Sequence, residues 1–372
     1  MELMFQKEDL SKYLQMLQGV ASGRNTLPIL SNILIRAGNG KIEMAATDLE
    51  VGIKVNVPGE ITEEGDITVP ARKLAEIVRE LASEHAVKLV TVENDRVQVE
   101  SGDGVYKIVG MPADDFPPMP EIDGDSFTIS GELLISMIDK TEFAASTEEA
   151  RYFLNGLYFS LTSELTKVVA TDGRRLAVAS SETLLADEDE GNSIGVIVPL
   201  KAIKEIAKIF VESPEVKISL KENQILFADD DATLVSRLVD GEYPQYEKII
   251  PDSNEIEIGI VVDSDKISGS LRRVSLFSNP KNRLLRVDVK SETMRVSAKS
   301  PEFGEAFETL EVSSANGEID IGFDAQYIKE ALAHIGSGEI LFEFKDALSA
   351  VTIRPVESED HLCLIMPMRL DA

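Results

Sequence analysis

The chain has 372 residues, of which 43% are hydrophobic, and its formal net charge is -29. This length predicts two or three domains, and the sequence holds no apolar run of about 18 residues that would form a membrane-spanning helix. One cysteine and three histidines argue against a disulfide framework and a zinc site, and they suit a reducing cytoplasm. The acidic start MELMFQKEDL does not have the pattern of a signal peptide. Taken alone, the acidic charge argues against DNA as a partner.

In chain order, each third of the sequence holds two segments in which a strand leads into a helix. The first segments begin at Met4, Phe127 and Ile260. The second segments are ITVPARKLAEIVREL from Ile67, VIVPLKAIKEIAKIF from Val196 and the more diverged IDIGFDAQYIKEALAHIG from Ile319. β-Branched runs favour strands, and apolar residues at helical spacing form one buried stripe. The predicted helices cover 7–24, 72–83, 130–142, 200–212, 264–277 and 326–336.

Strand-rich meanders lie between the two helices of each third. Their strand pairs read IEMAATDLEVGIKV from Ile42, KVVATDGRRLAVAS from Lys167 and MRVSAKSPEFGEAFETL from Met294. The chain therefore reads as three copies of one domain, at 1–125, 126–252 and 253–372, with boundaries in proline- and aspartate-rich stretches. Two helices and roughly eight short strands per copy predict an α+β fold with helices on one face of antiparallel sheet. Three fused copies can form an arc, and arcs that pair head to tail can close into a ring.

Positive charge is concentrated on the predicted helices. They hold 14 Lys and Arg against 11 Asp and Glu, whereas the remainder holds 23 against 55. Helices that lined one concave surface would give it a charge of opposite sign to the outside. Lysine and arginine are also good helix formers on solvated faces, so the count alone leaves a functional and a structural interpretation open.

The threefold repeat, together with the motifs VPARK, RYFLNG, ATDGRRLA and MPMRL, resembles the bacterial sliding clamp family, the beta subunits of DNA polymerase III. The resemblance covers the whole chain. It implies three clamp domains and a head-to-tail homodimer that closes into a ring, with helices lining the hole. Duplex DNA would pass through without being read in sequence. Such a ring tethers the replicative polymerase and has no catalytic residues, no metal, no cofactor and no membrane contact of its own.

The resemblance also explains the charge, because a weakly basic lining holds DNA loosely while each neutralised phosphate adds salt-dependent affinity. Tyr152 and Phe153 could touch DNA by stacking, or they could be buried. Arg272 and Arg273 are further candidates for DNA contact. The main basic candidates for DNA contact are Arg24, Arg72, Lys73, Lys201, Lys204 and Lys208.

The closing run LCLIMPMRL combines an apolar strand with two methionines, which are common at surfaces that accept several partners. A final core strand is the alternative interpretation for Leu362 and Leu364. The resemblance implies a groove for short apolar peptides of the DNA polymerase III alpha subunit, the clamp loader, other polymerases and repair proteins. Carried over residue by residue, the groove consists of Leu154, Thr171, Gly173, Arg174, Arg175, Leu176, Pro244, Ile249, Leu364, Met366, Pro367, Met368, Arg369 and Leu370.

Two details of this groove depart from the usual pattern of the family, and one motif has an alternative interpretation. Arg174 stands where the family often has histidine, which makes the rim more basic. Asp371 and Ala372 extend past the usual terminal leucine and could narrow the mouth of the groove. The Asp-Gly of TDGRRLA is also a turn signal, so a purely structural role remains an alternative for that motif.

For the homodimer, the resemblance implies that Leu276 and Phe277 of one chain pack against Tyr106 and Ile108 of the other. A plain core role is the alternative for Ile108. Two other function classes compete with the ring. An enzyme is disfavoured because the sequence has no phosphate loop, no nucleophile elbow and no metalloprotease motif. A scaffold that binds peptides without encircling DNA would need the groove but neither the basic helices nor the ring.

Overall fold

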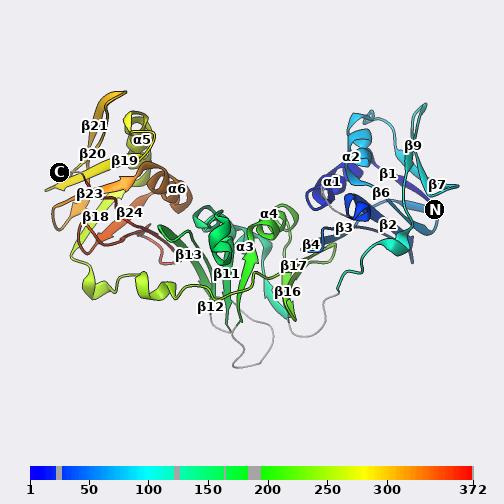
Figure 1. The fold of residues 1–372 in the computed structure, drawn as a ribbon, viewed down its shortest axis with the longest axis horizontal. Helices are drawn as coiled ribbons and strands as arrows, with labels where there is room; N and C mark the ends of the chain where they lie inside the picture. Colours follow the sequence, from blue (N-terminus) through cyan, green and yellow to red (C-terminus); the bar gives the residue numbers. More distant parts are fainter. Residues whose placement is uncertain (22–26, 121–125, 163–164, 183–193, 371–372) are drawn as a thin grey trace. The chain divides into compact units, whose positions relative to one another are not determined.

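A computed structural model of the chain describes residues 1–21, 27–120, 126–162, 165–182 and 194–370 (Figure 1). Arg24, Asp371 and Ala372 lie outside the described residues. The described chain separates into two compact units, each considered by itself. The first comprises 1–135 and 201–238, and the second comprises 136–182, 194–200 and 239–370.

All six expected helices are present; the first five are shorter than the sequence predicted, and the sixth has the predicted length but begins and ends one residue earlier. Their bounds are α1 (Lys7–Gln18), α2 (Ala71–Glu80), α3 (Gly131–Asp139), α4 (Leu200–Ile209), α5 (Ser264–Val274) and α6 (Ala325–Ile335). The expectation that the first helix continues to residue 24 was wrong, because the Gly19 amide bonds the Met16 carbonyl at 3.3 Å and ends the regular ladder. The fifth helix ends at Val274 and tightens into a 3₁₀ turn, Ser275–Phe277.

Helix starts follow the sequence signals. Pro70 and Pro199 end the strands that precede α2 and α4, where the fixed φ of proline suits the first helical turn. Asp263 and Asp324 cap α5 and α6, each with a carboxylate oxygen that accepts a backbone N–H of the first turn. In Figure 1, α1 and α2 lie side by side in the first unit, as α5 and α6 do in the second.

The first unit contains two antiparallel sheets. The eight-stranded sheet has the order β10-β15-β16-β17-β4-β3-β2-β6, and the five-stranded sheet has the order β5-β1-β7-β8-β9. Their strands are β1 (Glu2–Phe5), β2 (Asn32–Gly38), β3 (Lys41–Thr47), β4 (Val51–Asn56), β5 (Glu60–Glu63), β6 (Gly65–Pro70), β7 (Val87–Val92), β8 (Arg96–Ser101), β9 (Gly104–Val109), β10 (Ser126–Ile129), β15 (Val216–Lys221), β16 (Gln224–Ala228) and β17 (Ala232–Arg237).

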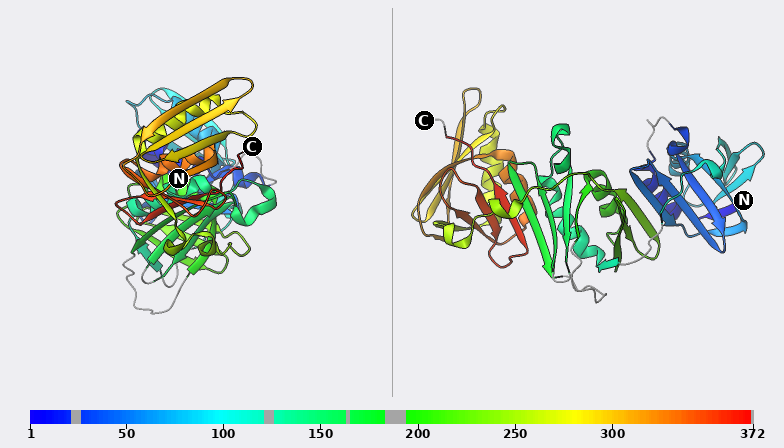
Figure 2. Two further views of the ribbon diagram at one scale, coloured as in Figure 1. Left: turned by 90° about the vertical axis from the view of Figure 1, so that its left-hand side faces the viewer. Right: turned by 60° about the horizontal axis from the view of Figure 1, so that its bottom comes forward.

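The second unit also contains two antiparallel sheets, and Figure 2 shows the strands of its longer sheet running beside one another. The nine-stranded sheet has the order β14-β11-β12-β13-β26-β25-β24-β18-β22, and the four-stranded sheet has the order β21-β20-β19-β23. Their strands are β11 (Gly156–Leu161), β12 (Leu165–Thr171), β13 (Arg175–Glu182), β14 (Ile194–Pro199), β18 (Ile258–Asp263), β19 (Leu284–Lys290), β20 (Thr293–Ser300), β21 (Gly304–Glu311), β22 (Ser314–Ala315), β23 (Ile319–Asp324), β24 (Glu339–Phe344), β25 (Val351–Pro355) and β26 (His361–Ile365).

The two longer sheets follow one plan. In the first, β6-β2-β3-β4 continues into β17-β16-β15-β10, and in the second, β14-β11-β12-β13 continues into β26-β25-β24-β18. The register agrees at the point of joining, where Gly52 pairs with Val235 and Leu176 pairs with Leu364. Each longer sheet therefore combines strands from two successive sequence copies. The sequence did not predict this sharing, because the repeat pattern identifies strands but not their partners.

Candidate functional site

The cations of α2 project into solvent. Arg72 Nε lies 2.9 Å from Glu76 Oε1, and Lys73 Nζ lies 3.0 Å from Glu76 Oε2. Hydrogen bonds from the two cations hold the pKa of Glu76 below its usual range. All three side chains are accessible, so these pairs are weak and an incoming phosphate can compete for them.

On α4, the three expected cations differ in their surroundings. Lys201 pairs with the carboxylate of Asp48, and burial lowers the pKa of this lysine. Lys208 Nζ lies 2.8 Å from Glu205, whereas Lys204 is exposed. The six helices as observed hold 12 Lys and Arg against 9 Asp and Glu, in a chain with 37 against 66. Their excess of positive charge is therefore slight.

The candidate aromatic residues lie in a short 3₁₀ segment, Glu149–Leu154. Tyr152 is 55% exposed, which excludes the buried alternative for its side chain. Phe153 is half-buried, and its ring meets the Tyr152 ring edge to face at 5.9 Å between centroids. Of the two further basic candidates on α5, Arg272 is exposed, while Arg273 donates to both carboxylate oxygens of Glu308 at 2.7 Å.

The motif TDGRRLA forms the turn between β12 and β13. Asp172 Oδ1 accepts the backbone N–H of Arg174 and of Arg175, and Thr171 Oγ1 accepts that of Gly173. Gly173 has φ of 83°, and a Cβ on it would lie 2.7 Å from Arg151 Nη1. Glycine is therefore favoured both by the backbone conformation and by the close arginine.

The two arginines of this motif have different roles. Arg175 is 10% exposed, pairs with Asp172 at 3.1 Å and with Glu330, and lies over the Tyr327 ring at 4.7 Å. Because Glu330 and Tyr327 both belong to α6, Arg175 links β13 to that helix. Removing either member of such a buried ion pair would leave an uncompensated charge. Arg174 is exposed and donates to the Tyr327 hydroxyl, which raises the pKa of the arginine. Only Arg174 is therefore available at the surface.

The structure brings the distant segments of the expected groove together in the second unit. Leu176 pairs with Leu364 across β13 and β26, and the Met366 amide donates to the Arg174 carbonyl at 2.9 Å. The Met368 amide donates to the Gly322 carbonyl at 2.8 Å, so the closing segment runs along β23. The exposed groove residues are Gly173, Arg174, Pro244, Ile249, Met366 and Arg369.

Several expected groove residues are covered by the chain itself. The buried ones are Leu154, Thr171, Leu176 and Leu364, and the half-buried ones are Arg175, Pro367, Met368 and Leu370. Leu176, Leu364 and Tyr246 form one apolar cluster with Val169 and Val178. The core interpretation of Leu364 is therefore correct in this conformation, and a ligand reaches Leu176 or Leu364 only after the covering side chains move.

Three tyrosines of this cluster were missed by the sequence analysis. The Tyr243 ring stacks on the Tyr158 ring at 4.9 Å between centroids, and Tyr246 is 4% exposed. Burial raises the pKa of Tyr243 and of Tyr246. The signal was the pair of tyrosines in YPQY, which stood in a stretch interpreted as a linker. Tyr246 therefore packs directly on the expected groove floor, beside Leu176 and Leu364.

The expected dimer residues lie near two sheet edges. β9 is the edge of the five-stranded sheet and exposes Val105 (57%), Tyr106 (42%) and Val109 (65%). Ile108 is only 5% exposed within the single chain, which agrees with the alternative of a core role, and its contact with a second chain stays a prediction. β21 is the edge of the four-stranded sheet and exposes Phe307 (60%). Leu276, in the 3₁₀ turn after α5, is 73% exposed, and Phe277 is half-buried.

Within the described ranges, no three His, Cys, Asp or Glu side chains are grouped closely enough to hold a metal ion. The helices of the same ranges include none that is long and apolar enough to span a membrane. Cys363 is buried, and burial raises the pKa of its thiol to about 12, which makes it a poor nucleophile.

Three family models match the chain in succession. They are the DNA polymerase III beta subunit N-terminal domain over residues 1–120, the central domain over 128–245 and the C-terminal domain over 247–369. The beta sliding clamp of Pseudomonas aeruginosa is 34% identical over 373 residues, covering 100% of both chains. The sliding clamp of P. aeruginosa bound to griselimycin has a TM-score of 0.94 and 33% identity, and the polymerase sliding clamp of Bacillus subtilis has 0.93 and 29%. Both comparisons cover 100% of each chain.

Proposed function

This chain belongs to the DNA polymerase III beta-subunit family, the sliding clamps of replication, and from that premise we propose that two copies pair head to tail and close around duplex DNA. The protein is a replication clamp with three clamp domains and not an enzyme. We place the domain boundaries at 125/126 and 252/253. The break between matched ranges at 120–128 supports the first boundary, whereas the break at 245–247 lies a few residues before the second.

The observation that carries the dimer is the plan of the sheets. Each longer sheet joins four strands of one sequence copy to four strands of the next. The third copy has the corresponding four strands, ending at β21, and the first copy has the corresponding partner strands, ending at β9. Both are edge strands within the chain and both expose apolar side chains. An unpaired edge is a template for another chain, so β21 of one copy would pair with β9 of a second copy.

The register of this pairing follows from the two internal joins. Glu305 of β21 has the position that Gly52 has in β4, and Lys107 of β9 has the position that Val235 has in β17. Copying the Gly52–Val235 register places Lys107 opposite Glu305 and Val105 opposite Phe307. An opposite-charge pair and an apolar pair are both favourable cross-strand neighbours. The register was derived from strand positions alone, without regard to side chains. The favourable pairing of these four side chains therefore supports it independently.

The duplex would contact the helices. Arg72, Lys73, Lys201, Lys204 and Lys208 are all exposed on α2 and α4, although Lys201 and Lys208 are paired with carboxylates, and the exposed Tyr152 could stack on the duplex. Arg24 lies outside the described residues and remains a proposed contact. A slight positive excess suits a clamp that slides, since strong phosphate binding would resist movement. A clamp that encircles DNA would act in the bacterial cytoplasm, and we propose that location for this protein.

The partner peptides would bind the exposed groove rim of the second unit, where Met366 and Ile249 present apolar side chains beside Arg174. Apolar peptide tails of the polymerase III alpha subunit, the clamp loader, other polymerases and repair proteins are the proposed ligands. Griselimycin-bound clamps show that relatives bind a ligand. The buried floor at Leu176 and Leu364 would open when Tyr243 or Tyr246 moves.

The ring is tested with a nicked circular DNA, the protein, its cognate clamp loader and ATP. Bound protein is separated by gel filtration, and the measurement is repeated after the circle is cut once. Retention on circles and loss after cutting is expected of a closed ring. Equal retention on both forms would indicate surface binding and exclude the ring. Loss of retention on circles with intact peptide binding would instead favour a scaffold that never encircles DNA.

The register is tested by charge exchange. Lys107→Glu and Glu305→Lys each place like charges opposite one another, so each variant should weaken the dimer in sedimentation velocity. The double variant restores an opposite-charge pair and should recover the dimer. If both single variants sediment as the parent does, the proposed register is wrong. The effect is expected to be about 1 kcal/mol or less per exchange at an accessible edge.

A further inference from the structure

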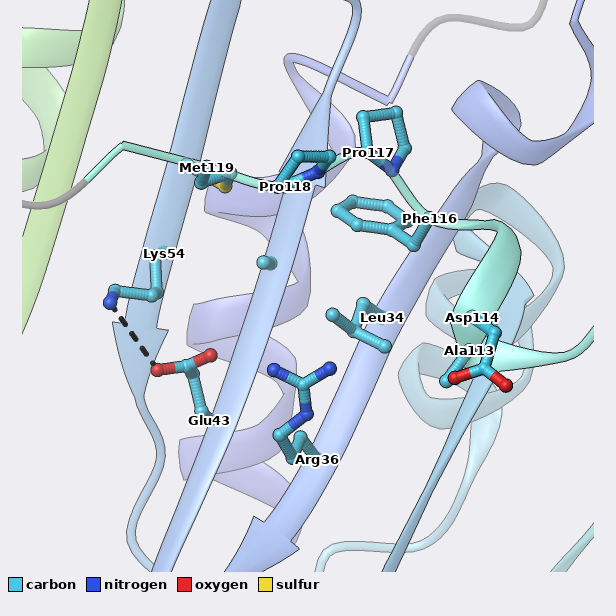
Figure 3. Close-up of a pocket in the computed structure, with 11 residues that line it drawn as sticks. Leu34, Arg36, Glu43, Lys54, Ala113, Asp114, Phe116, Pro117, Pro118 and Met119 are labelled. Carbon is cyan, nitrogen blue, oxygen red and sulfur yellow. Dashed lines mark ion pairs between the residues drawn. The ribbon is translucent and has the colours of Figure 1, made fainter.

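A cavity of about 530 Å³ lies on the eight-stranded sheet, where strands β2, β3 and β4 meet the segment 113–119 that follows β9 (Figure 3). Leu34 and Ala45 form its apolar floor, and Phe116 covers part of it. Arg36, Glu43 and Lys54 lie along one side in Figure 3. All of these residues belong to the first unit, whereas the groove residues described above belong to the second.

The corresponding place on the nine-stranded sheet is filled. Strand register matches Leu34, Ala45 and Lys54 to Tyr158, Val169 and Val178. There the segment 243–250 supplies two aromatic rings, Tyr243 stacked on Tyr158 and Tyr246 packed among the valines. The two sites are therefore built on the same strands of successive copies, and they differ in what fills them.

The segment that follows β9 supplies one aromatic ring, Phe116, to the first site, where the segment 243–250 supplies two to the second. Phe116 packs on the floor in the manner of Tyr243. Three residues later stands Met119 instead of a tyrosine, and its Cε lies 2.8 Å from the position a Cβ on Gly52 would have. Gly52 corresponds to Leu176, so Met119 fills the place of that leucine side chain. The space that Tyr246 occupies in the second site is left as cavity above Ala45.

Lys54 and Arg36, on the charged side of the cavity, form only long ion pairs among the described residues. Lys54 Nζ lies 3.5 Å from Glu43 Oε2, and Arg36 Nε lies 3.7 Å from Asp66 Oδ2. Charge-assisted hydrogen bonds are normally about 2.7–2.9 Å, so both ion pairs are loose. Asp114 and Glu43 are the carboxylates that line the cavity. A ligand carboxylate would compete with Glu43 for Lys54 and with Asp66 for Arg36.

We propose that this cavity binds a short peptide in which an aromatic residue adjoins a carboxylate. The ring enters above Ala45 beside Phe116, and the carboxylate binds Lys54 and Arg36. The chain itself contains such a pair at the filled site, where Tyr246 adjoins Glu247 in sequence and the Tyr246 ring packs with Val169. The proposal goes beyond the clamp function and does not depend on ring closure or on the groove of the second unit.

The probe is a fluorescein-labelled synthetic peptide with the sequence of residues 242–249, EYPQYEKI, added to the full chain. Fluorescence anisotropy measures its affinity. Lys54→Glu should weaken binding at least about tenfold, the size of one charge-assisted contact reversed. Lys54→Met keeps the apolar stem and removes the charge, so a smaller loss is expected. A peptide with the second tyrosine replaced by alanine should also bind at least about tenfold less tightly.

Lys41→Glu is the matched control, because it reverses one exposed charge on β3 outside the cavity lining. It should leave the affinity unchanged, and circular dichroism should show that all variants fold. The proposal is overturned if Lys54→Glu and Lys41→Glu have equal effects, since binding would then lie elsewhere or follow net charge. Absence of saturable binding up to about 1 mM, the limit of a weak specific site, would also overturn it.

Discussion

The turns 47–51 and 171–175 have the same hydrogen bonds and different surroundings. In the first, Asp48 Oδ1 accepts the amides of Glu50 and Val51, and Thr47 Oγ1 accepts that of Leu49. The second turn repeats this pattern with Asp172 and Thr171. Both central residues have positive φ, 76° for Leu49 and 83° for Gly173.

The difference lies in what the aspartates bind outside the turn. The second carboxylate oxygen of Asp48 binds Lys201, whereas that of Asp172 binds Arg175 within the same motif. The shared threonine and aspartate are therefore structural, as the turn interpretation of TDGRRLA held. The turn 47–51 forms the same hydrogen bonds without arginine residues, so Arg174 and Arg175 are not needed for the turn itself. The two longer sheets also differ at the next matched position, where the first sheet has Gly52 and the second has Leu176.

The largest expected effect is at that floor position. Leu176→Ala removes a side chain that is 1% exposed in the apolar cluster, so we expect a loss of about 2–5 kcal/mol in the free energy of unfolding. Gly52→Ala should be nearly neutral, because the new Cβ would clash only with the flexible end of Met119 and would lie at ordinary contact distance, 3.4 Å, from Thr47 Oγ1. Urea unfolding of both variants measures the contrast. Equal losses would mean that the two floors are packed alike.

Acid should affect the two longer sheets unequally. His361 in β26 is 1% exposed, while β17 has Ala232 at the matching position. Burial lowers the pKa of His361 from 6.5 to about 4, so the unfolded chain binds a proton in that window that the folded chain does not. The free energy of unfolding is therefore highest above pH 6.5 and decreases as the pH falls from 6.5 toward 4. Linkage makes the loss about 2 kcal/mol by pH 5.

The measurement for this prediction is urea unfolding at pH 7 and at pH 5, in the parent chain and in His361→Gln. Glutamine keeps a side-chain amide donor for the Lys140 carbonyl, which His361 Nε2 contacts at 2.9 Å. The variant should lose less stability than the parent between the two pH values. Equal losses would show that other groups account for the acid sensitivity.

A smaller effect is expected at the second turn. Gly173→Ala places a Cβ on a residue with φ of 83° and within 2.7 Å of Arg151 Nη1. We expect a loss of about 1–2 kcal/mol in the free energy of unfolding, from backbone strain and displacement of Arg151. Thermal unfolding measures the loss. An unchanged melting temperature would mean that the turn adopts another backbone conformation without cost.

The smallest effect should have the opposite sign. Leu49→Gly relieves a leucine held at φ of 76°, and the side chain is 46% exposed. Relief of strain outweighs the added freedom of the unfolded chain, so we expect a gain of up to about 1 kcal/mol. The measurement is again thermal unfolding. A loss of stability would show that Leu49 makes packing contacts that its exposure does not suggest.

The sequence predicted the elements better than their partners. Helical spacing located all six helices, but it predicted that the first one continues beyond Gly19. In the structure this helix ends at Gln18. Paired motifs located the hairpin β12–β13. The joining of β4 to β17 could not be predicted, because alternation shows which face of a strand is buried and not which strand lies beside it. The tyrosines of YPQY were missed because proline and polar residues in a connection resemble a solvated linker.

The free edges at β9 and β21 have a consequence for assembly. Their proposed contact is between two different surfaces, so each added copy presents a fresh edge to the next. Nothing in the Lys107–Glu305 pairing limits the number of copies to two. Heterologous contacts of this kind give a closed ring only when the rotation per copy divides a full turn, and they give open fibres otherwise. Substitutions that change the angle between domains, even far from either edge, would therefore turn a clamp into a polymer.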